Sequence, residues 1–414
     1  MTTSATSVDA GVTPSEDEFA AAARQFLDEH ASKRPVERFV WGQGSDDVGL
    51  LAERTREEDL ADLAAARSWA QTSFDAGFGW ITGPPAYGGR GLPRSYQRIY
   101  DAIEAEYRTP SQSVFGIGLG MVAPTILAHA TEKVKQAYLR DLYRGDIVAC
   151  QLFSEPGAGS DLASLQTRAD RDGDEWVLNG QKVWTSGAHL SDIGEIICRT
   201  DPTLPKHRGL TGFVIDMHAA GVEVRPLRQM TGGASFNEVF LTDVRVADDH
   251  RLGEVNGGWT VALTTLMNER AAIGGGGGGA TTAGTQRLVD LCRAMGKSED
   301  PLVRQKLADV IIRSRVAHYS VLRSMAALAV GQLPGPEMSL AKMALTATMR
   351  QTTELLTLAL GPALVADSGQ WGTFAWSQYL MGVVGMRIAG GTDEVLRNIV
   401  GERVLGLPKE PRPD

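Results

Sequence analysis

Ser154 to Asp161 read SEPGAGSD, a short polar stretch whose residue types suit ligand binding. Gly157 and Gly159 carry no Cβ, so a ligand could approach their backbone closely, and Pro156 restricts its own φ angle. Backbone amides in such a turn can gather around a flat or an anionic ligand. The stretch therefore predicts a binding loop.

A second stretch, EWVLNGQKVWTSG, begins at Glu175. Its Asn179-Gly180 pair lies between two runs with strand character, which is the strongest short-range sign of a tight hairpin with a type I′ turn. On the returning strand, Trp184 and Ser186 are two residues apart and would share a face. An indole beside a hydroxyl donor suits a planar heteroaromatic ring with hydrogen-bonding edges.

In their order and spacing, these two stretches resemble the flavin-binding middle domain of the acyl-CoA dehydrogenase family. Glycine turns and an edge tryptophan also occur in unrelated β domains, but the combination is far more specific. The resemblance extends over most of the chain and implies FAD as the cofactor. It places Phe153 and Ser154 on one side of the isoalloxazine ring and Trp184 and Ser186 on the other. Ser186 would donate toward N5, the atom that receives hydride.

The same resemblance implies the other candidate contacts. Ser160 matches the residue that approaches the pantetheine arm of CoA, and Arg270 would order the substrate side of the site. Gln305, in RQKLAD, is a candidate contact of an FAD amide. Thr392 and Glu394 match positions that contact FAD near the closing helix, although Glu394 could instead touch the flavin of a partner subunit.

The part of the FAD motif that binds the pyrophosphate of a neighbouring subunit is weak in this chain. In LCRAMGKSEDP, Arg293 aligns with the usual arginine only through a gap, and Met295 replaces an aromatic residue. Leu358 stands where a glutamine is usual, shortly before Gly361. How the adenosine end of FAD is bound stays open.

Dehydrogenation of a saturated acyl thioester needs a base for the α proton and a hydride acceptor over the β carbon. Protein side chains cannot accept hydride, so a flavin would do so, and the base would be a carboxylate whose pKa desolvation raises. In many family members the base directly precedes a Gly-Thr pair, but here Gly390 precedes Gly391-Thr392. Isovaleryl- and long-chain-type members instead carry a glutamate directly before an arginine, and Glu269-Arg270 in LMNERAAIG matches that place. The resemblance therefore implies Glu269 as the base.

Other interpretations of these carboxylates stay open. Glu269 could be an exposed helix carboxylate paired with a neighbouring cation, as most helical glutamates are. Asp393 and Glu394 are rival bases, although acids in the first turn of a helix are also favoured by the helix dipole.

Two glycine-rich runs occur, Gly274 to Gly279 directly after the Glu269 region and GIGLG at 116–120. A helix through the six glycines would lose on the order of 1 kcal/mol per glycine relative to alanine. The Lys and Ser/Thr of a phosphate-binding loop are missing. We interpret the runs as a weakened helix and a widened pocket for a bulky, branched or long acyl group, although close helix packing would also select glycine.

The hydrophobic periodicity changes twice along the chain and indicates an α+β fold. We expect a disordered tail over 1–16, an N-terminal helical domain over 17–147, a middle antiparallel, barrel-like β domain over 148–258 and a C-terminal helical bundle over 259–414. The resemblance implies that this bundle has four helices.

Composition excludes several classes of protein. The net charge of −9 leaves no basic stripe for nucleic acid. The three cysteines are far apart, without disulfide or zinc spacing, which is typical of a reduced, cytoplasmic protein. The seven histidines show no metal-ligand spacing, residues 1–16 show no signal peptide, and no run of 18 apolar residues could span a membrane.

These observations predict an FAD-dependent acyl-CoA dehydrogenase that forms trans-2-enoyl-CoA from an acyl-CoA substrate. The resemblance also implies an electron-transferring flavoprotein as acceptor and a homodimer or homotetramer, with a heteromer left open. One alternative is a flavin monooxygenase or oxidase of the same fold, which needs no α-proton base. A second is a non-catalytic subunit of a heteromeric dehydrogenase, because the usual base is missing and the FAD motif is weak.

Overall fold

The computed structural model describes residues 13–35, 39–50, 54–275, 280–329 and 338–409, and these divide into two compact units. The first unit contains the N-terminal residues, 56–116 and 132–148. The second contains 39–50, 54–55, 117–131 and the described residues from Ala149 onward. Most of the predicted tail, residues 1–12, lies outside the described residues. The three domain boundaries stay a prediction.

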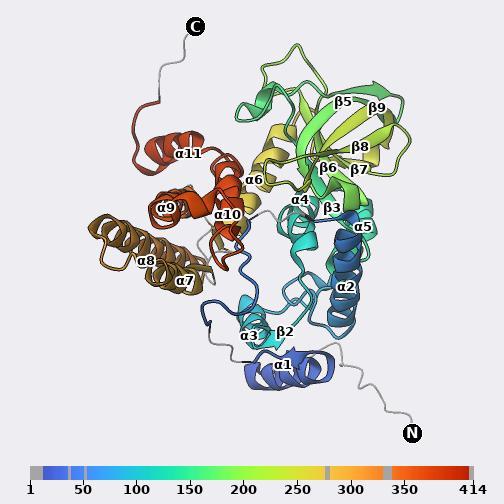
Figure 1. Cartoon of the computed structure of the whole chain (residues 1–414). Helices are drawn as coiled ribbons and strands as arrows, with labels where there is room; N and C mark the ends of the chain where they lie inside the picture. Colours follow the sequence, from blue (N-terminus) through green and yellow to red (C-terminus); the bar gives the residue numbers. More distant parts are fainter. Residues whose placement is uncertain (1–12, 36–38, 51–53, 276–279, 330–337, 410–414) are drawn as a thin grey trace. The chain divides into compact units, whose positions relative to one another are not determined.

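The first unit is built from helices around an aromatic core, with one two-stranded ladder (Figure 1). Helix α1 begins with a capping box, in which Ser15 and Glu18 each bond the other's backbone N–H. Its apolar face places Phe19 against Phe78 and Tyr96. The elements are α1 (Glu16–His30), β1 (Ser32–Lys33), α2 (Arg56–Asp75), α3 (Arg94–Glu104), β2 (Tyr107–Arg108) and α5 (Glu132–Arg144), with 3₁₀ turns at Pro85–Tyr87 and Ser113–Phe115.

The second unit contains the sheet, whose strand order is β10-β7-β6-β4-β5-β9-β8, with β3 also paired to β6. The pairs are antiparallel except β3–β6 and β4–β6, which are parallel. Inward side chains such as Trp176, Phe213 and Val244 form its core. The strands are β3 (Ala149–Leu152), β4 (Arg168–Asp172), β5 (Glu175–Ser186), β6 (Ile193–Arg199), β7 (Leu210–Asp216), β8 (Val222–Leu227), β9 (Phe236–Ala247) and β10 (Arg251–Leu252). The 3₁₀ turns of this part lie at Leu162–Ser164, Ala188–Leu190 and Asp248–His250.

The hairpin predicted at Asn179-Gly180 is wrong. Strand β5 runs through both residues, and the hairpin that joins β4 to β5 turns at Gly173, where φ is 68°. Between Leu178 and Gly180 the pairing with β9 shifts register, because Asn179 alone stands opposite Thr242 and Asp243. Gly180 therefore flanks a β-bulge whose extra residue is on β9. A Cβ at Gly180 would lie 2.4 Å from Thr167 Oγ1. Close approach of the neighbouring backbone, rather than a turn, therefore explains this glycine.

The C-terminal helices of the second unit form the predicted bundle, in which α6, α7, α8 and α9 pack on one another, and α6 also packs on β7. Helix α6 includes Gly274 and Gly275, and Gly276 to Gly279 lie outside the described residues. The helices are α4 (Ala123–His129), α6 (Gly258–Gly275), α7 (Ala280–Ala294), α8 (Pro301–Ala329), α9 (Met338–Leu360), α10 (Ala375–Met386) and α11 (Asp393–Ile399), with π-helical turns at Gly118–Val122 and Val400–Val404 and a 3₁₀ turn at Gly361–Leu364. In the described part of the chain, no helix is long and apolar enough to cross a membrane.

Residues 39–50 pack against helices that lie far along the chain. Trp371 Nε1 donates to the carbonyl oxygen of Gly44 at 2.9 Å, and the Arg287 guanidinium donates to that of Asp46 at 2.5 Å. The rings of Trp41 and Trp371 meet edge to face, with centroids 4.9 Å apart. This segment therefore packs on the core around α7 and α10, against which Trp41 and Val48 are partly buried.

Candidate functional site

The loop that begins at Ser154 is anchored on strand β5. The backbone N–H of Val183 donates to the carbonyl oxygen of Ser154 at 2.9 Å, and the Lys182 ammonium donates to that of Phe153 at 3.1 Å. Phe153 is buried and Ser154 is half-buried. The loop residues predicted on one side of a ring ligand are thus adjacent to the strand that carries Trp184.

A buried ion pair locks this attachment, and the sequence analysis missed it. Lys182 Nζ lies 2.8 Å from Glu155 Oε1 and 2.9 Å from the carbonyl oxygen of Ile197. The Glu155 carboxylate also accepts the backbone N–H groups of Gln166 and Thr167. Burial raises the pKa of Glu155, but the charge and hydrogen bond of Lys182 outweigh burial and hold the pKa below its usual range. A lysine at an inward-facing strand position was the available signal, because such a residue needs a buried partner.

Trp184 has a left-handed backbone conformation, which is unusual for a bulky residue. Its φ is 60°, in the left-handed region that bulky side chains avoid. Its side chain is 60% exposed and meets Phe236 edge to face at 6.0 Å. The ladder with β9 shifts register between Lys182 and Thr185, so the simple alternation that would place Trp184 and Ser186 on one face does not apply. Strained backbone of this kind is concentrated at functional sites.

The residues present fit a flat heteroaromatic group such as the ring of FAD. Trp184 offers an exposed indole, and the half-buried Ser186 on the same strand offers a hydroxyl. At Gly157 and Gly159, an added Cβ would have no described atom within 4 Å. The backbone of the loop is therefore open to a ligand.

Ser160, the candidate contact for the pantetheine arm, is exposed in the same loop. The next residue, Asp161, binds Lys206 at 2.7 Å and accepts the Ser164 hydroxyl at 2.6 Å. These contacts join the Ser160 end of the loop to the connection between β6 and β7. Ser160 is thus held at the surface of the sheet region.

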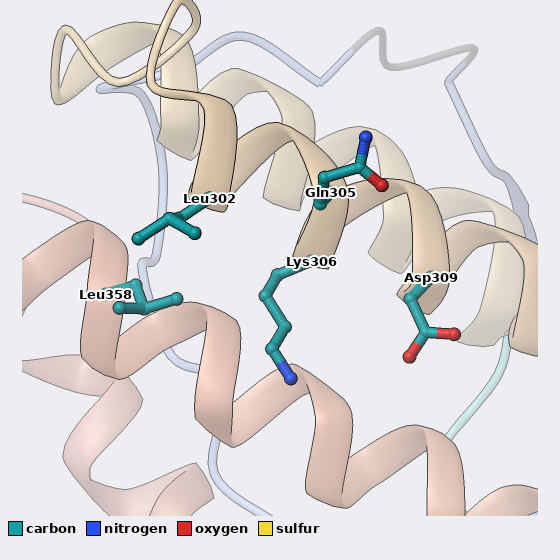
Figure 2. Close-up of a pocket in the computed structure, with 5 residues that line it drawn as sticks. All are labelled: Leu302, Gln305, Lys306, Asp309 and Leu358. Carbon is teal, nitrogen blue, oxygen red and sulfur yellow. The ribbon is translucent and has the colours of Figure 1, made fainter.

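Gln305 lies on α8 and lines an open pocket of about 300 Å³ (Figure 2). The pocket also contains Leu302, Lys306, Asp309 and Leu358, the residue that stands where a glutamine is usual in the family. Lys306 reaches across to α9, where it binds Gln351 and Glu354. The described lining contains no residue of the sheet, so Gln305 belongs to a different part of the candidate site than Trp184.

Glu269 lies on α6, where its side chain is half-buried. Helix α6 packs against β7 and against the π-helical turn at Gly118–Val122. This turn contains most of the GIGLG run, and Gly118 itself is buried. Arg270 follows on the same helix, and its side chain lies outside the described part of the chain.

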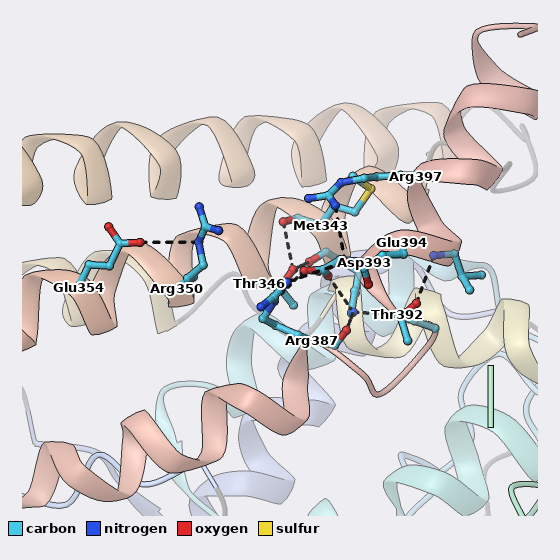
Figure 3. A network of polar contacts seen from close by, with 12 residues as sticks. Met343, Thr346, Arg350, Glu354, Arg387, Thr392, Asp393, Glu394 and Arg397 are labelled. Carbon is cyan, nitrogen blue, oxygen red and sulfur yellow. Dashed lines mark hydrogen bonds and ion pairs between the residues drawn. The ribbon is translucent and has the colours of Figure 1, made fainter. Parts of the chain in front are cut away.

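Asp393, a rival base, is held by three side chains at the start of α11 (Figure 3). Its Oδ1 accepts from Thr346 Oγ1 at 2.9 Å and from the buried Lys342 at 3.3 Å, while Oδ2 accepts from Arg387 at 3.1 Å. Burial raises the pKa of Asp393, but the hydrogen bonds and charges of these three residues outweigh burial and lower it. A carboxylate held in this way is a poor proton acceptor.

The other two candidates on α11 have local roles as well. Thr392 caps the helix, because its hydroxyl accepts the backbone N–H of Val395 at 3.2 Å. Glu394 is exposed and lies 3.6 Å from Arg397. Before them, Gly390 and Gly391 have φ values of 67° and 90°. A glutamate at position 390, the commonest place for the base, would be strained in that conformation.

Metal chemistry has no support in the described residues, among which no three His, Cys, Asp or Glu side chains gather. The candidate site has four described parts. They are the loop and strand around Trp184, Glu269 on α6, the Thr392 cap of α11 and the pocket beside Gln305 on α8.

Three family models match the chain in succession. The N-terminal domain of acyl-CoA dehydrogenase matches residues 13–146, the middle domain matches 150–244 and the C-terminal domain matches 256–405.

Named relatives agree with the family models. The acyl-CoA dehydrogenase IpdE1 of Mycobacterium tuberculosis is 35% identical over 345 residues, which cover 83% of this chain and 88% of IpdE1. The acyl-CoA dehydrogenase FadE34 of the same organism is 38% identical over 366 residues, 88% of this chain. The chain covers 47% of the length of FadE34.

Solved structures show the same fold. A Tcur3481-Tcur3483 steroid ACAD has a TM-score of 0.73 at 28% identity, with 97% of this chain and 100% of that chain covered. The ChsE4-ChsE5 complex from Mycobacterium tuberculosis has a TM-score of 0.68 at 26% identity, with 97% and 100% covered. The chain therefore belongs to the acyl-CoA dehydrogenase family, a family of FAD-dependent oxidoreductases.

Proposed function

We propose that the chain dehydrogenates an acyl-CoA thioester to trans-2-enoyl-CoA with FAD as cofactor and Glu269 as the α-proton base. The contacts of Asp393 are the observation that carries this proposal. Asp393 is engaged by Lys342, Thr346 and Arg387, and Gly390 has a left-handed backbone that disfavours the commoner base. Glu269 is then the remaining carboxylate at a position where the family places a base.

FAD, when bound, supplies the hydride acceptor that protein side chains cannot provide. The chain's own part is to hold the ring and the acyl group and to remove one proton. A general base contributes about 10²- to 10⁴-fold to such a reaction. Exclusion of water by the acyl group would make a carboxylate at this position a stronger proton acceptor. We assign ring binding to Phe153, Ser154, Trp184 and Ser186, further FAD contacts to Gln305, Thr392 and Glu394, and substrate contacts to Ser160 and Arg270.

For the acyl group we propose a bulky ring system. The related Tcur3481-Tcur3483 protein is described as a steroid ACAD. In this chain the π-helical turn at Gly118–Val122 packs against the Glu269 helix, and its glycines present no side chains there. Small residues beside the base leave space for a wide substrate.

An anaerobic titration with straight, branched and steroid-like acyl-CoAs tests this function through the flavin absorbance. We expect a steroid-like thioester to bleach the wild-type flavin and Glu269→Gln to lose bleaching by at least about 10²-fold. Glu299→Gln is the matched control, because the Glu299 side chain is 93% exposed and has no assigned role, and it should bleach like wild type. Equal bleaching in Glu269→Gln would exclude Glu269 as the base, and rapid reoxidation of the reduced flavin by air would favour an oxidase or a monooxygenase.

A second candidate is one subunit of a two-protein dehydrogenase. Two similar structures are named as pairs, Tcur3481-Tcur3483 and ChsE4-ChsE5. If the isolated chain is pure, folded and free of flavin, and binds FAD only after co-expression with a second family member, this candidate replaces the homo-oligomer.

An electron-transferring flavoprotein is the acceptor we propose in either case, and its reduction in a coupled assay would test that.

A further inference from the structure

Glu195 is a buried carboxyl group that the proposed reaction does not use. It lies in the middle of β6, whose seven residues are all buried. Its side chain is 0% exposed, as are those of Thr265 on α6 and Thr125 on α4. Glutamate is almost never fully buried without a partner that compensates its charge. Among the described residues, no ion pair includes Glu195.

A chain of short contacts runs from Glu195 through two hydroxyl groups to a backbone carbonyl. Glu195 Oε1 lies 2.6 Å from Thr265 Oγ1, and Thr265 Oγ1 lies 2.9 Å from Thr125 Oγ1. Thr125 Oγ1 lies 2.8 Å from the carbonyl oxygen of Met121, in the π-helical turn. The chain therefore connects the sheet, α6, α4 and that turn.

The number of protons in this chain limits how many of its three short contacts can be hydrogen bonds. The Met121 carbonyl can only accept, so the single proton of Thr125 serves that contact. Thr265 Oγ1 also lies 3.2 Å from the carbonyl oxygen of Val261, but its shorter contact, at 2.9 Å, is with Thr125 and uses its single proton. The remaining contact, between Glu195 and Thr265, needs a proton from Glu195 itself. All three hydrogen bonds form only when Glu195 is a neutral carboxylic acid.

The neighbouring strands place no opposing charge beside Glu195. Its register partners are Gln151 on β3 and Val214 on β7, both uncharged. Arg199, on the same face of β6, donates to the carbonyl oxygens of Ala163 and Lys206.

Among the described side chains, the helices on this face contribute two titratable groups. His129 on α4 contacts Thr264 at 2.8 Å, and burial lowers its pKa, so it is neutral at pH 7. Glu269 lies one turn beyond Thr265 on α6. Burial raises the pKa of Glu195 to about 8, and the contact with Thr265 opposes the rise. A neutral Glu195 at pH 7 agrees with the proton count.

We propose that Glu195 is a positioning residue, which as a neutral acid donates the first hydrogen bond of a chain that holds the Glu269 helix against the sheet. For its effect on the reaction, this inference rests on the proposed function of Glu269. Thr265 and Glu269 are four residues apart and so lie on one face of α6, with Cβ atoms about 5–6 Å apart. A shift of Thr265 is therefore transmitted directly to Glu269.

Ionisation of Glu195 dismantles this arrangement. A carboxylate cannot donate, so the Thr265 proton must turn toward it, and one of the contacts of Thr125 is lost. A buried charge without a cation also disfavours the closed packing of β6 and α6. Helix α6 is then expected to loosen as the pH rises through about 8.

Infrared difference spectra test the protonation state without any substrate. Wild type minus Glu195→Gln is expected to show the C=O band of a protonated carboxylic acid at pH 7 and to lose it as the pH passes about 8. If this band is missing at pH 7, Glu195 is ionised and the inference is wrong.

Hydrogen exchange over residues 258–275 tests the anchoring of α6, again without substrate. At pH 7 wild type and Glu195→Gln should exchange alike, because the amide N–H also donates. At pH 9 wild type should exchange about tenfold faster than Glu195→Gln at the same pH. Thr265→Ser should behave like wild type, whereas Thr265→Val should exchange faster at every pH. If Glu195→Gln does not fold, the comparison of Thr265→Ser with Thr265→Val decides the inference. If Glu195→Gln also exchanges faster at pH 9 than at pH 7 to the same extent as wild type, the inference is wrong.

The pH profile of kcat/KM tests the link to the reaction. We expect wild type to lose activity about tenfold per pH unit above pH 8 and Glu195→Gln to keep its activity over that range. An alkaline loss that is identical in both proteins contradicts the positioning role. If no acyl-CoA reduces the flavin, the proposed function fails, while the infrared and exchange results still decide whether Glu195 anchors α6.

Discussion

Both carboxylate oxygens of Asp393 are engaged, which weighs against Asp393 as a base. Lys342, which is buried, donates to Asp393 and to the carbonyl oxygens of Arg387 and Gly391. The Lys342 ammonium therefore ties the loop before α11 to Asp393. We propose that this cluster holds the Gly390-Gly391 conformation and the helix cap rather than moving a proton of the substrate.

Asp393→Asn is expected to destabilise the protein without removing the base. The substitution leaves the Lys342 ammonium buried without its negative partner, which costs about 3 kcal/mol or more. Chemical denaturation should show this loss in the free energy of unfolding, while Glu394→Gln, at an exposed pair, should change it by less than about 1 kcal/mol. Folded Asp393→Asn that retains stability but loses all flavin bleaching would restore Asp393 as a candidate base.

The pH dependence of stability should carry the signature of Glu195. The native state binds this proton more tightly than the unfolded chain, with pKa values of about 8 and 4.5 respectively. The stabilising contribution is therefore complete below pH 4.5 and is lost as the pH rises to about 8. Over that window, wild type should lose up to about 1.4 kcal/mol per pH unit relative to Glu195→Gln. Parallel denaturation curves for the two proteins at all pH values would contradict this.

The buried polar residues are the part of the site that sequence could not locate. Phe153, Ser154 and Trp184 could be proposed because their types and local spacing match a known pattern. Glu155 with Lys182, and Glu195 with Thr265, depend on pairings across 27 and 70 residues. The hydrophobic periodicity of a short segment does not reveal pairings between residues so far apart. A glutamate inside the apolar run IGEIIC was a signal that a partner must exist, but not which one.

At the scale of elements, strand β5 determines how the ring-binding residues are presented. One irregularity lies at Gly180 and another between Lys182 and Thr185, with Trp184 in a left-handed conformation. Between them Lys182 points inward to Glu155, which fixes the strand. Together with these two register shifts, the left-handed backbone leaves the Trp184 indole exposed beside the strand.

Gly180→Ala is expected to destabilise the sheet because a Cβ would clash with Thr167 Oγ1 and Cα at 2.4 and 2.7 Å. Overpacking of this kind costs about 1–3 kcal/mol. Gly173→Asn is the matched control, since asparagine tolerates φ near 68° and a Cβ there has open space among the described atoms. Differential scanning calorimetry should show a lower Tm for Gly180→Ala only, and flavin content should fall with it. Equal Tm values for both variants would argue against a tight bulge.

A period of two is visible in the strands themselves, whereas a local turn signature was misleading. Burial alternates along most of Val222–Leu227, for example, which forms β8. The hairpin prediction at Asn179-Gly180 failed because this dipeptide occurs both in hairpin turns and beside bulges. Only the pairing with the partner strand distinguishes the two. The β5–β9 pairing continues through Gly180, which sequence periodicity alone cannot reveal.

At the scale of the whole molecule, α8 carries an apolar stripe that its own bundle leaves exposed. Ile312, Val316 and Tyr319 are 60%, 56% and 61% exposed. Their spacing of four and three residues places them on one helix face. An exposed apolar face of this kind is typical of an interface between subunits, and we propose that role for it.

Val316→Asp is expected to weaken subunit association, because a charge would be buried in that interface. Size-exclusion chromatography with light scattering should show a smaller species than wild type at the same concentration. Leu60→Asp, which adds a charge at an exposed leucine of α2, should leave the mass unchanged. If Val316→Asp retains the wild-type mass, the stripe is not the subunit interface.

The attachment of residues 39–50 to the C-terminal helices has a consequence for synthesis on the ribosome. Gly44 and its partner Trp371 are 327 residues apart. At about 5–20 residues per second, roughly 16–65 s pass between the translation of the two. During that interval the nascent chain displays the rings of Phe39 and Trp41 without Trp371, which both contact in the folded protein. Chaperone occupancy of this segment should therefore last until translation is nearly complete.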